Sequence, residues 1–345
     1  MNATLERLPR DALTELASKA LQTYGLKQDD ARSTAEVLVL ADMFGLHTHG
    51  VSRVQSYGER MEIGGINAAA RPAIENVAPS ISRLDGQNGV GPLVGQAALQ
   101  EAIRLARTTG LGAVFARASN HFGPISPYAY MAAQQGFASF ICSNASTTIA
   151  PWGGREARLG NSPLGFGVPN PEGDPFLVDM AMSVVARAKI RNALRSGESI
   201  PATWATDKQG RATTDPQMAL DGFLMAIGGH KGYGLALVVD LLAGLLSGAS
   251  FLTHVRSWSA EPEQPQDLGH LFLLIDTARL GTAGWLAGRM RDFFRILHDT
   301  PPADPASPVL VPGEIELTKF RQAEAEGVEV EAAALRHIKS RMQKA

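Results

Sequence analysis

Short apolar runs, separated by glycine and proline, are the feature that most constrains how this chain can fold. They occur at 81–84, 111–116, 138–143, 164–169, 176–179 and 271–276. Runs this short are typical of β-strands. Between the first two lies a helical pattern from Pro92 to about Arg107, with the proline suited to the first turn. The order strand, helix, strand predicts a βαβ-like unit.

Helical spacing of apolar residues predicts further helices at 8–24, from Asp29 or Asp30 to 44, and at 48–63, 283–299 and 329–344. The last of these is charged, which predicts a solvated face. The segment 230–247 contains the longest apolar stretch, interrupted by Asp240. That stretch is too short to span a bilayer, and it predicts one long buried helix.

Charge and cysteine content exclude several classes of protein. The 345 residues, enough for two or three domains or one large one, include 32 Lys and Arg against 34 Asp and Glu, so no overall basic excess favours nucleic acid. The single cysteine, Cys142, excludes an intramolecular disulfide and a cysteine-rich zinc site, and its apolar surroundings indicate an inert thiol. The first residues lack the apolar region of a secretory signal. We therefore expect a cytoplasmic protein with neither nucleic acid nor a membrane as partner.

A stretch rich in histidine carries the first candidate chemistry. If a helix begins near Thr48, then His49, Arg53 and Tyr57 lie at i, i+4 and i+8 on one face. Arginine binds a carboxylate with two hydrogen bonds and histidine exchanges a proton near neutral pH, so this face suits a small carboxylate substrate. Spacing alone also fits, and favours, a solvated helix face with Thr48 as its N-cap. A metal on His47 and His49 would need ligands that the spacing does not reveal, so no metal is predicted.

Three further positions are candidates for a binding site. His121 follows an apolar run, where it is well placed to line a cleft, although a loop histidine bonded to the backbone is an alternative. The glycines of 228–234, around His230 and Lys231, either bind an anion at a helix N-terminus or pack closely on the core. Asp179, at the end of an apolar run, is either a helix cap or a buried orienting carboxylate.

Common nucleotide-binding and hydrolase motifs do not match. The glycines of 89–95 follow a strand and open a helix, but their spacing and the lack of an acid after the second strand favour a plain turn over a Rossmann site. The segment 228–234 lacks the spacing of a P-loop. No Gly-x-Ser-x-Gly or His-Glu-x-x-His sequence occurs, so serine hydrolase and zinc protease chemistry have no support.

Eight short motifs follow one another along the chain. They are Thr48-His49-Gly50-x-x-Arg53-x-x-x-Tyr57, Gly64-Gly65-Ile66-Asn67, Ser119-Asn120-His121-Phe122-Gly123, Ala150-Pro151-Trp152-Gly153-Gly154-Arg155, Gly160-Asn161-Ser162-Pro163, Val178-Asp179-Met180-Ala181, Gly228-Gly229-His230-Lys231-Gly232-Tyr233-Gly234 and Val311-Pro312-Gly313-Glu314. In this order they resemble the malate/L-lactate dehydrogenase family, which is distinct from the classical Rossmann lactate dehydrogenases. Its relatives include ureidoglycolate and sulfolactate dehydrogenases, 2,3-diketogulonate reductase and Δ1-piperideine-2-carboxylate reductases.

The resemblance implies an α/β fold that is not Rossmann. A central NAD(P)-binding domain, expected at 76–300, contains a largely antiparallel sheet in this family. A helical domain built from both termini, here 1–75 and 301–345, covers the cleft. Members are usually dimeric, so a homodimer is expected.

The resemblance also assigns roles to residues. His49 matches the catalytic histidine, which some members orient with a serine, here Thr48, and a distant aspartate, here Asp179. Arg53 and Tyr57 match substrate-binding positions. His121 matches a residue assigned to catalysis in some members and to cofactor contact in others. The expected cofactor contacts are His121, Phe122, Gly123, Ser146, Asp179, Met180, Ala181, His230, Lys231, Gly313 and Glu314.

The implied activity is hydride transfer between NAD(P)H and C2 of a small 2-oxo acid, with either NAD or NADP as cofactor. Arg53 would hold the substrate carboxylate and His49 would protonate the forming alkoxide, with His121 as the second candidate. A cyclic imino acid reductase is the alternative among enzymes. A cofactor-binding protein without turnover is the alternative of another class, because Thr48, Met182 and Arg187 stand at positions where the family has Ser, Thr and Gly.

Overall fold

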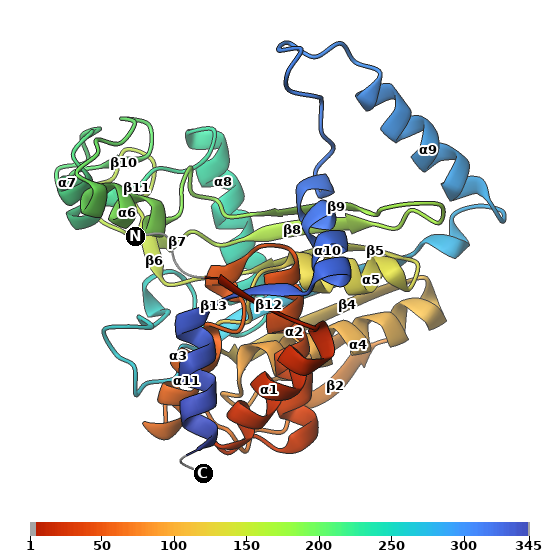
Figure 1. The fold of residues 1–345 in the computed structure, drawn as a ribbon, viewed down its shortest axis with the longest axis horizontal. Helices are drawn as coiled ribbons and strands as arrows, with labels where there is room; N and C mark the ends of the chain where they lie inside the picture. The colour runs from red at the N-terminus through yellow and green to blue at the C-terminus, as the bar shows by residue number, and fades with distance from the viewer. Residues whose placement is uncertain (1–4, 344–345) are drawn as a thin grey trace.

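The computed structural model describes residues 5–343 and has a seven-stranded sheet at its centre (Figure 1). In spatial order the strands are β2 (Ala73–Ala78), β3 (Ile81–Asp85), β4 (Leu111–Ser119), β12 (Leu268–Asp276), β5 (Phe137–Ser143), β8 (Leu164–Val168) and β9 (Phe176–Met180). β3 and β4 run parallel, and the other neighbouring pairs of this sheet are antiparallel. The mixed α/β fold with a largely antiparallel sheet is therefore confirmed.

The predicted βαβ-like unit is present as β3, α4 (Gly91–Thr109) and β4. Pro92 lies in the first turn of α4, and Leu99 on its inner face is fully buried. A Cβ at Gly112 of β4 would lie 2.1 Å from the carbonyl oxygen of Ala102. Helix and strand therefore pack with no side chain between them at this point. α5 (Ser126–Gln134) packs against β5 and β8.

Both ends of the chain contribute to one helical layer. The first part comprises α1 (Arg10–Gln22), α2 (Gln28–Met43) and α3 (Arg53–Glu62), and the last part comprises α10 (Glu314–Glu326) and α11 (Ala332–Met342). β1 (Leu5–Leu8) pairs antiparallel with β13 (Val328–Glu331). Figure 1 shows the blue C-terminal helix α11 beside the red N-terminal helices, in agreement with the contacts of α11 with α1 and α3. The domain boundaries at 75 and 301 stay a prediction.

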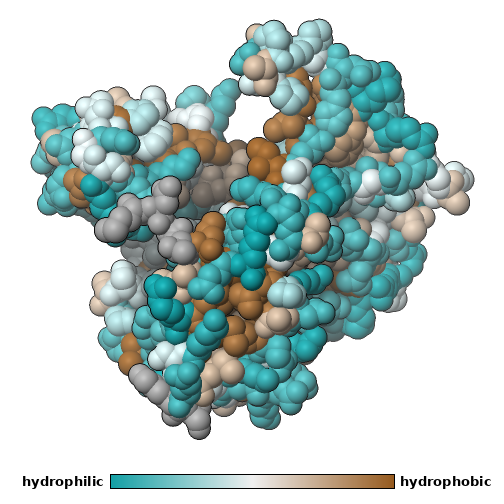
Figure 2. All heavy atoms as spheres, viewed as in Figure 1, coloured by the Kyte–Doolittle hydropathy of each residue, from teal (hydrophilic) through white to brown (hydrophobic). Residues whose placement is uncertain are grey.

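A smaller lobe is built from the middle of the chain. It contains α6 (Arg187–Ser196), α7 (Pro216–Asp221), α8 (His230–Val239) and a second sheet of β10 (Ala205–Thr206), β11 (Phe223–Leu224), β6 (Thr147–Ile149) and β7 (Leu159–Gly160). The lobe has its own apolar core, which includes Ile149, Ile190 and Leu224. On the face drawn in Figure 2, apolar residues gather in the hollow between this lobe, on the left, and the projecting arm on the right.

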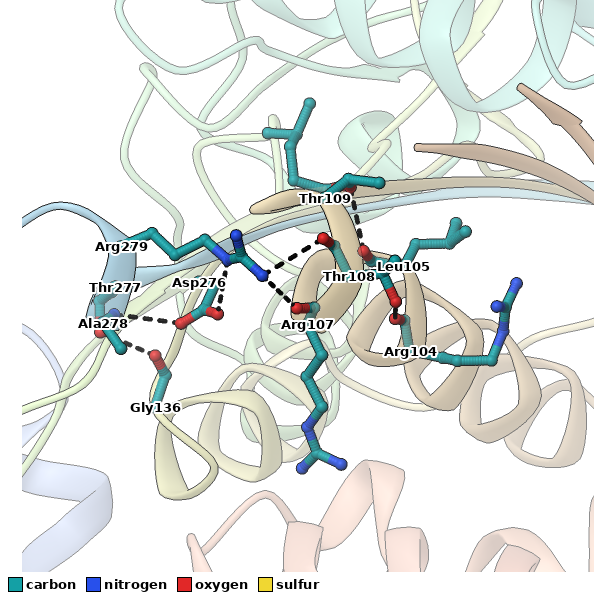
Figure 3. Close-up of polar contacts among 11 residues, drawn as sticks. Arg104, Leu105, Arg107, Thr108, Thr109, Gly136, Asp276, Thr277, Ala278 and Arg279 are labelled. Carbon is teal, nitrogen blue, oxygen red and sulfur yellow. Dashed lines mark hydrogen bonds and ion pairs between the residues drawn. The ribbon is translucent and has the colours of Figure 1, made fainter. Parts of the chain in front are cut away.

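The arm is α9 (Trp285–His298), which projects from the body in Figure 1 and confirms the helix predicted at 283–299. The chain reaches it from β12 through a single 3-10 turn, Thr277–Arg279. In that turn the Arg279 guanidinium donates to the carbonyl oxygens of Arg107 and Thr108 at the end of α4, and the Thr277 hydroxyl donates to the carbonyl oxygen of Gly136 (Figure 3). These contacts tie one end of β12 to the two neighbouring helices.

The helix predicted at 48–63 is wrong in its first turn. His47–His49 form one 3-10 turn, and α3 begins only at Arg53. Gly50 between them has an extended backbone (φ −84°, ψ −150°), so the helix does not run through it. The backbone N–H of Val51, the next residue, donates to the buried carboxylate of Asp42 at 2.7 Å. His49 therefore lies on a turn before the helix that carries Arg53 and Tyr57, and not on the same helix face.

The long buried helix predicted at 230–247 is also wrong in part. α8 ends at Val239 and continues as a π-helix, Asp240–Leu245. Small residues such as Ala236 and Ala243 are buried, whereas larger apolar residues on the opposite face project outward. Those residues are Leu235, Val238, Leu241, Leu245 and Leu246, which are 45–59% exposed.

The predicted C-terminal helix begins later than expected. Residues 329–331 belong to β13, and α11 begins at Ala332. The alternation of Val328 and Val330, both buried, with half-buried glutamates is the period of a strand, and pairing with β1 stabilises it. Two isolated 3-10 turns, His47–His49 and Leu252–His254, complete the described elements apart from the turn after β12.

Candidate active site

A cavity of about 850 Å³ lies where the loops after β4 and β5 approach β9 and the segment 310–316. Because β12 pairs with both β4 and β5, the ends of those two strands lie close together. Much of the predicted site lines this one cavity. The predicted residues in its wall are His49, His121, Phe122, Gly123, Asp179, Met180, Ala181 and Gly313.

Two neutral imidazoles face each other in the wall of this cavity. The ring centres of His49 and His121 lie 5.4 Å apart, with an angle of 31° between the ring planes. Burial, aided by the charge of Arg53, lowers the pKa of His49 to about 4. Burial lowers the pKa of His121 well below its ordinary value, and Arg53 and His49 act in the same direction. Both rings are therefore uncharged at neutral pH.

Thr48 and Arg53 fix the surroundings of His49. The Thr48 hydroxyl lies 2.9 Å from Nδ1 of His49, so Nε2 is the ring nitrogen left for a ligand. Nε of Arg53 donates to the carbonyl oxygen of Thr48 at 2.6 Å, which places the guanidinium beside the same turn. Arg53 has no carboxylate partner among residues 5–343. Its charge is free to hold an anion, and a single anion there would lie next to His49.

Tyr57 lies behind His121 and is fully buried, although it was predicted to contact substrate. Its hydroxyl is 2.7 Å from Nδ1 of His121. Burial raises the pKa of Tyr57, so the phenol keeps its proton. In the tautomer in which Nδ1 of His121 accepts the hydrogen bond from this phenol, Nε2 carries the ring hydrogen and is a donor. The ring of Trp258 packs edge-on against both side chains, and the buried guanidinium of Arg60 lies 4.4 Å above the Trp258 ring.

Asp179 lines the cavity but caps a helix. Its carboxylate accepts hydrogen bonds of 2.8 Å from the backbone N–H groups of Ile125 and Ser126 and one of 3.0 Å from the Ser126 hydroxyl. These residues begin α5, so the helix-cap interpretation describes the contact that is present. No hydrogen bond within the described part of the chain joins Asp179 to Thr48 or His49.

Four predicted cofactor contacts lie outside the cavity wall. Ser146 is one residue beyond Ala145, which lines it. His230 and Lys231 begin α8, where the ring of His230 packs against Trp152, 5.9 Å away. The carboxylate of Glu314 instead accepts a hydrogen bond from the backbone N–H of Val311 and lies 2.8 Å from Nε2 of His298.

His270 is a buried residue of the site that the sequence did not indicate. Its Nδ1 lies 2.9 Å from the Ser143 hydroxyl and its Nε2 lies 2.8 Å from the Ser119 hydroxyl. Its ring stacks on Phe122 with centres 4.2 Å apart. His270 thus joins the ends of β4 and β5 directly beneath the cavity. The predicted strand began at 271, one residue past it, and a single histidine before an apolar run gave no reason to assign it.

The cavity fits a nicotinamide better than a metal ion. Its volume lies within the usual range for small-molecule sites. β9 is the edge strand of the central sheet, so peptide groups on its outer side are available to an amide, and apolar groups such as Leu268 and Pro163 line the wall. Across residues 5–343, no group of three or more His, Cys, Asp or Glu side chains could hold a metal ion. In the same range, no helix is long and apolar enough to cross a membrane.

The chain is similar to known proteins over most of its length. The model of the malate/L-lactate dehydrogenase family matches residues 8–339. Malate dehydrogenase from Pyrococcus abyssi is 37% identical over 302 residues, 85% of this chain and 82% of that protein. Ureidoglycolate dehydrogenase (NAD(+)) from Escherichia coli K12 is 34% identical over 325 residues, 94% of this chain and 92% of that protein.

Solved structures agree over nearly the whole chain. Malate dehydrogenase from Entamoeba histolytica superposes with a TM-score of 0.91 at 28% identity, covering 99% of this chain and 98% of that one. Δ1-Piperideine-2-carboxylate reductase from Pseudomonas syringae superposes with a TM-score of 0.87 at 29% identity, covering 97% and 99%. The similarity therefore extends to the sheet, the helical layer and the lobe together.

Protonation of the buried His270 is expected to make the protein less stable in acid. Burial lowers the pKa of His270 to about 3, whereas the unfolded chain takes up that proton near pH 6.5. The unfolded state then binds more protons, so stability falls as the pH drops from 6.5 toward 3, by about 1.4 kcal/mol per pH unit for one such histidine. His49 and His121 contribute with the same sign.

Urea unfolding at pH 7, 6 and 5 measures this effect. The variant His270→Gln is expected to lose part of the pH dependence, whereas His254→Gln, at an exposed position outside the site, is expected to keep all of it. An unchanged pH dependence in His270→Gln would contradict the buried, neutral state of this ring.

Proposed function

The chain belongs to the malate/L-lactate dehydrogenase family, and we propose that it transfers a hydride between NAD(P)H and C2 of a small 2-oxo acid, and in reverse oxidises the 2-hydroxy acid. The observation that carries this proposal is the pair of neutral imidazoles, 5.4 Å apart in a cavity wall, beside an arginine without a carboxylate partner in residues 5–343. Such a set suits an anionic substrate that gains or loses one proton.

Arg53 is the proposed anchor of the substrate carboxylate. Its Nε is held by Thr48, which leaves the other guanidinium nitrogens to form a bidentate pair with a carboxylate. This pairing orients C2 and its oxygen toward His49, because both residues are bound to the same short turn. The carboxylate also raises the pKa of His49 by adding a negative charge beside it.

His49 is the proposed acid and base. As a neutral ring with Nε2 exposed to the cavity, it accepts the proton of a 2-hydroxyl group during oxidation. In the direction of reduction it returns that proton to the forming alkoxide. His121, whose Nε2–H is directed by the bond from Tyr57, is proposed to donate a hydrogen bond to the same oxygen or to the nicotinamide amide. In the first case both rings stabilise charge on one substrate oxygen.

The proposed cofactor site is the wall formed by Phe122, Gly123 and the end of β9. Bound NAD(P) supplies the hydride acceptor and NAD(P)H the donor. The backbone of Met180 and Ala181 would hold the carboxamide, and Gly123 allows close approach because it carries no side chain. Family members are named for NAD(+) and for NADP(+), so both dinucleotides belong in the assay.

A screen for reductase activity tests the function. Wild-type protein with NADH or NADPH is expected to reduce 2-oxo acids such as oxaloacetate, pyruvate and sulfopyruvate, monitored by loss of reduced-nicotinamide absorbance. Cyclic imino acids belong in the same panel, because the carboxylate anchor is shared and a reductase of Δ1-piperideine-2-carboxylate has the same fold. Turnover of imines alone would favour the reductase alternative. Dinucleotide binding without any turnover would instead support the protein that binds cofactor only.

Replacement of His49 tests its assignment. His49→Ala removes the proton donor, so kcat is expected to fall by about 10²–10⁴-fold, with dinucleotide affinity preserved. His254→Ala, at an exposed position away from the cavity, is the matched control and is expected to keep full activity. Activity near that of the wild type in His49→Ala would assign the proton transfer to His121 instead.

We also propose a homodimer that buries the exposed apolar face of α8 and the π-helix. Monomeric proteins rarely leave so many large apolar side chains on one face uncovered, and five of them project here. Leu241→Glu places a charge in that face and is expected to weaken dimerisation by at least about tenfold, or ~1.4 kcal/mol. Sedimentation velocity measures the change, with Ile74→Glu on the exposed edge strand β2 as control. A wild-type monomer, or a Leu241→Glu dimer of unchanged affinity, would contradict this proposal.

A further inference from the structure

Asp42 is a buried carboxylate next to the candidate active site that no sequence motif indicated. It lies at the end of α2 and is 4% exposed. One of its oxygens lies 3.1 Å from Nδ1 of His47, and the other accepts the backbone N–H of Val51 at 2.7 Å. The two bonded residues stand immediately before and shortly after the pair Thr48 and His49. A single carboxylate therefore holds both ends of the turn that carries the proposed proton donor.

The backbone of this turn is shaped to contact the carboxylate. A Cβ at Gly50 would lie 2.0 Å from Oδ1 and 2.2 Å from Oδ2 of Asp42. The φ angle of Gly50 is −84°, which other residues adopt, so space and not backbone conformation requires glycine here. Close approach between Gly50 and Asp42 thus fixes how near the turn lies to α2, independently of the two hydrogen bonds.

Few other contacts hold the turn. The backbone N–H of His49 donates to the carbonyl oxygen of Leu46, and the Ser52 hydroxyl donates to that of His47. The N–H of Gly50 also donates to the carbonyl oxygen of His47, and Nε of Arg53 donates to that of Thr48. These bonds join residues 46–53 to one another, and none of them reaches α2. The bonds of Asp42 connect the turn to α2, which is packed in the main core through residues such as Leu38 and Val39, and the side chain of Val51 lies in the same core.

We propose that Asp42 is a positioning residue for the proton transfer. Its carboxylate holds the Thr48–His49 turn in place, so that His49 faces His121 and the cavity. This inference rests on the proposed function, in which His49 exchanges the proton. The family resemblance assigned the role of orienting His49 to Asp179, but the carboxylate of Asp179 accepts hydrogen bonds from Ile125 and Ser126. We assign that role to Asp42 instead.

Opposing effects act on the pKa of the Asp42 carboxyl group. Burial raises its pKa, while the bonds from His47 and Val51 lower it. The other charged groups near Asp42 and His47 come from the C-terminal part of the chain. They are Lys319 of α10 and Glu329 and Glu331 of β13. Among residues 5–343, His47 is the basic group within ion-pair distance of Asp42, and the hydrogen bond to Asp42 raises the pKa of His47.

Kinetics of Asp42 variants test the inference. Asp42→Ala removes both bonds and is expected to lower kcat by about 10²-fold, as a misplaced catalytic group does, while the Kd of the dinucleotide stays within about twofold. Asp42→Asn can still accept the Val51 N–H, so it is expected to retain more activity than Asp42→Ala. Gly50→Ala keeps the carboxylate, but the added methyl group would collide with it and push the turn away from α2. The same loss of kcat is expected.

Glu101→Gln is the matched control. Glu101 is also a buried carboxylate, 6% exposed and bonded to Ser82 and Arg104, but it lies outside the cavity wall. Its replacement is expected to lower the melting temperature and leave kcat unchanged. A loss of kcat in the Asp42 and Gly50 variants with dinucleotide affinity retained supports the inference. If Asp42→Ala does not fold, Asp42→Asn and Gly50→Ala decide it.

The possible failures can be distinguished. If the wild type turns over and the folded Asp42 and Gly50 variants keep kcat within about twofold of it, the positioning role is overturned while the proposed function stands. If the wild type oxidises neither NADH nor NADPH with any acid or imine of the panel, the proposed function fails and the positioning role fails with it.

Discussion

The pairing of β12 with both β4 and β5 is the constraint on which the rest of the structure depends. Because β12 is antiparallel to both β4 and β5, these two strands run in the same direction and end at the same side of the sheet. His270 then bridges the hydroxyls of Ser119 and Ser143 at that edge. The loop that carries His121 begins one residue beyond this bridge. A fully buried polar bridge requires both partners, so it fixes the height of the loop above the sheet.

The second half of the site comes from the helical layer. His49 reaches the cavity on a turn between α2, which packs on α4, α10 and β13, and α3, which packs on α1 and α11. At the site, the two parts meet in the facing rings of His49 and His121 and in the hydrogen bond between Tyr57 and His121. Burial lowers the pKa of both histidines, and both rings lie in the wall of the cavity.

Much of this arrangement could be predicted from the sequence. Short apolar runs identified the strands of the main sheet except β2, whose side chains are mostly exposed, and the motifs identified many of the residues in the cavity wall. Local periodicity failed where a tertiary contact overrides it. The extended backbone at Gly50, where a Cβ would collide with Asp42, interrupts the helix expected through 48–63, and pairing with β1 draws 328–331 into a strand. Asp42 and His270 act through partners that are distant in sequence or in another element, so no spacing rule could indicate them.

The most direct test of the account is a structure of the ternary complex with dinucleotide and a non-reducible amide analogue of the 2-oxo acid. We expect the analogue's carboxylate to bind the Arg53 guanidinium. The oxygen at C2 is expected to lie within hydrogen-bond distance of Nε2 of His49, about 2.6–3.2 Å. The nicotinamide would lie against Phe122 and the end of β9. An analogue whose C2 oxygen is bound elsewhere, with His49 beyond the reach of a hydrogen bond or a bridging water, would contradict it.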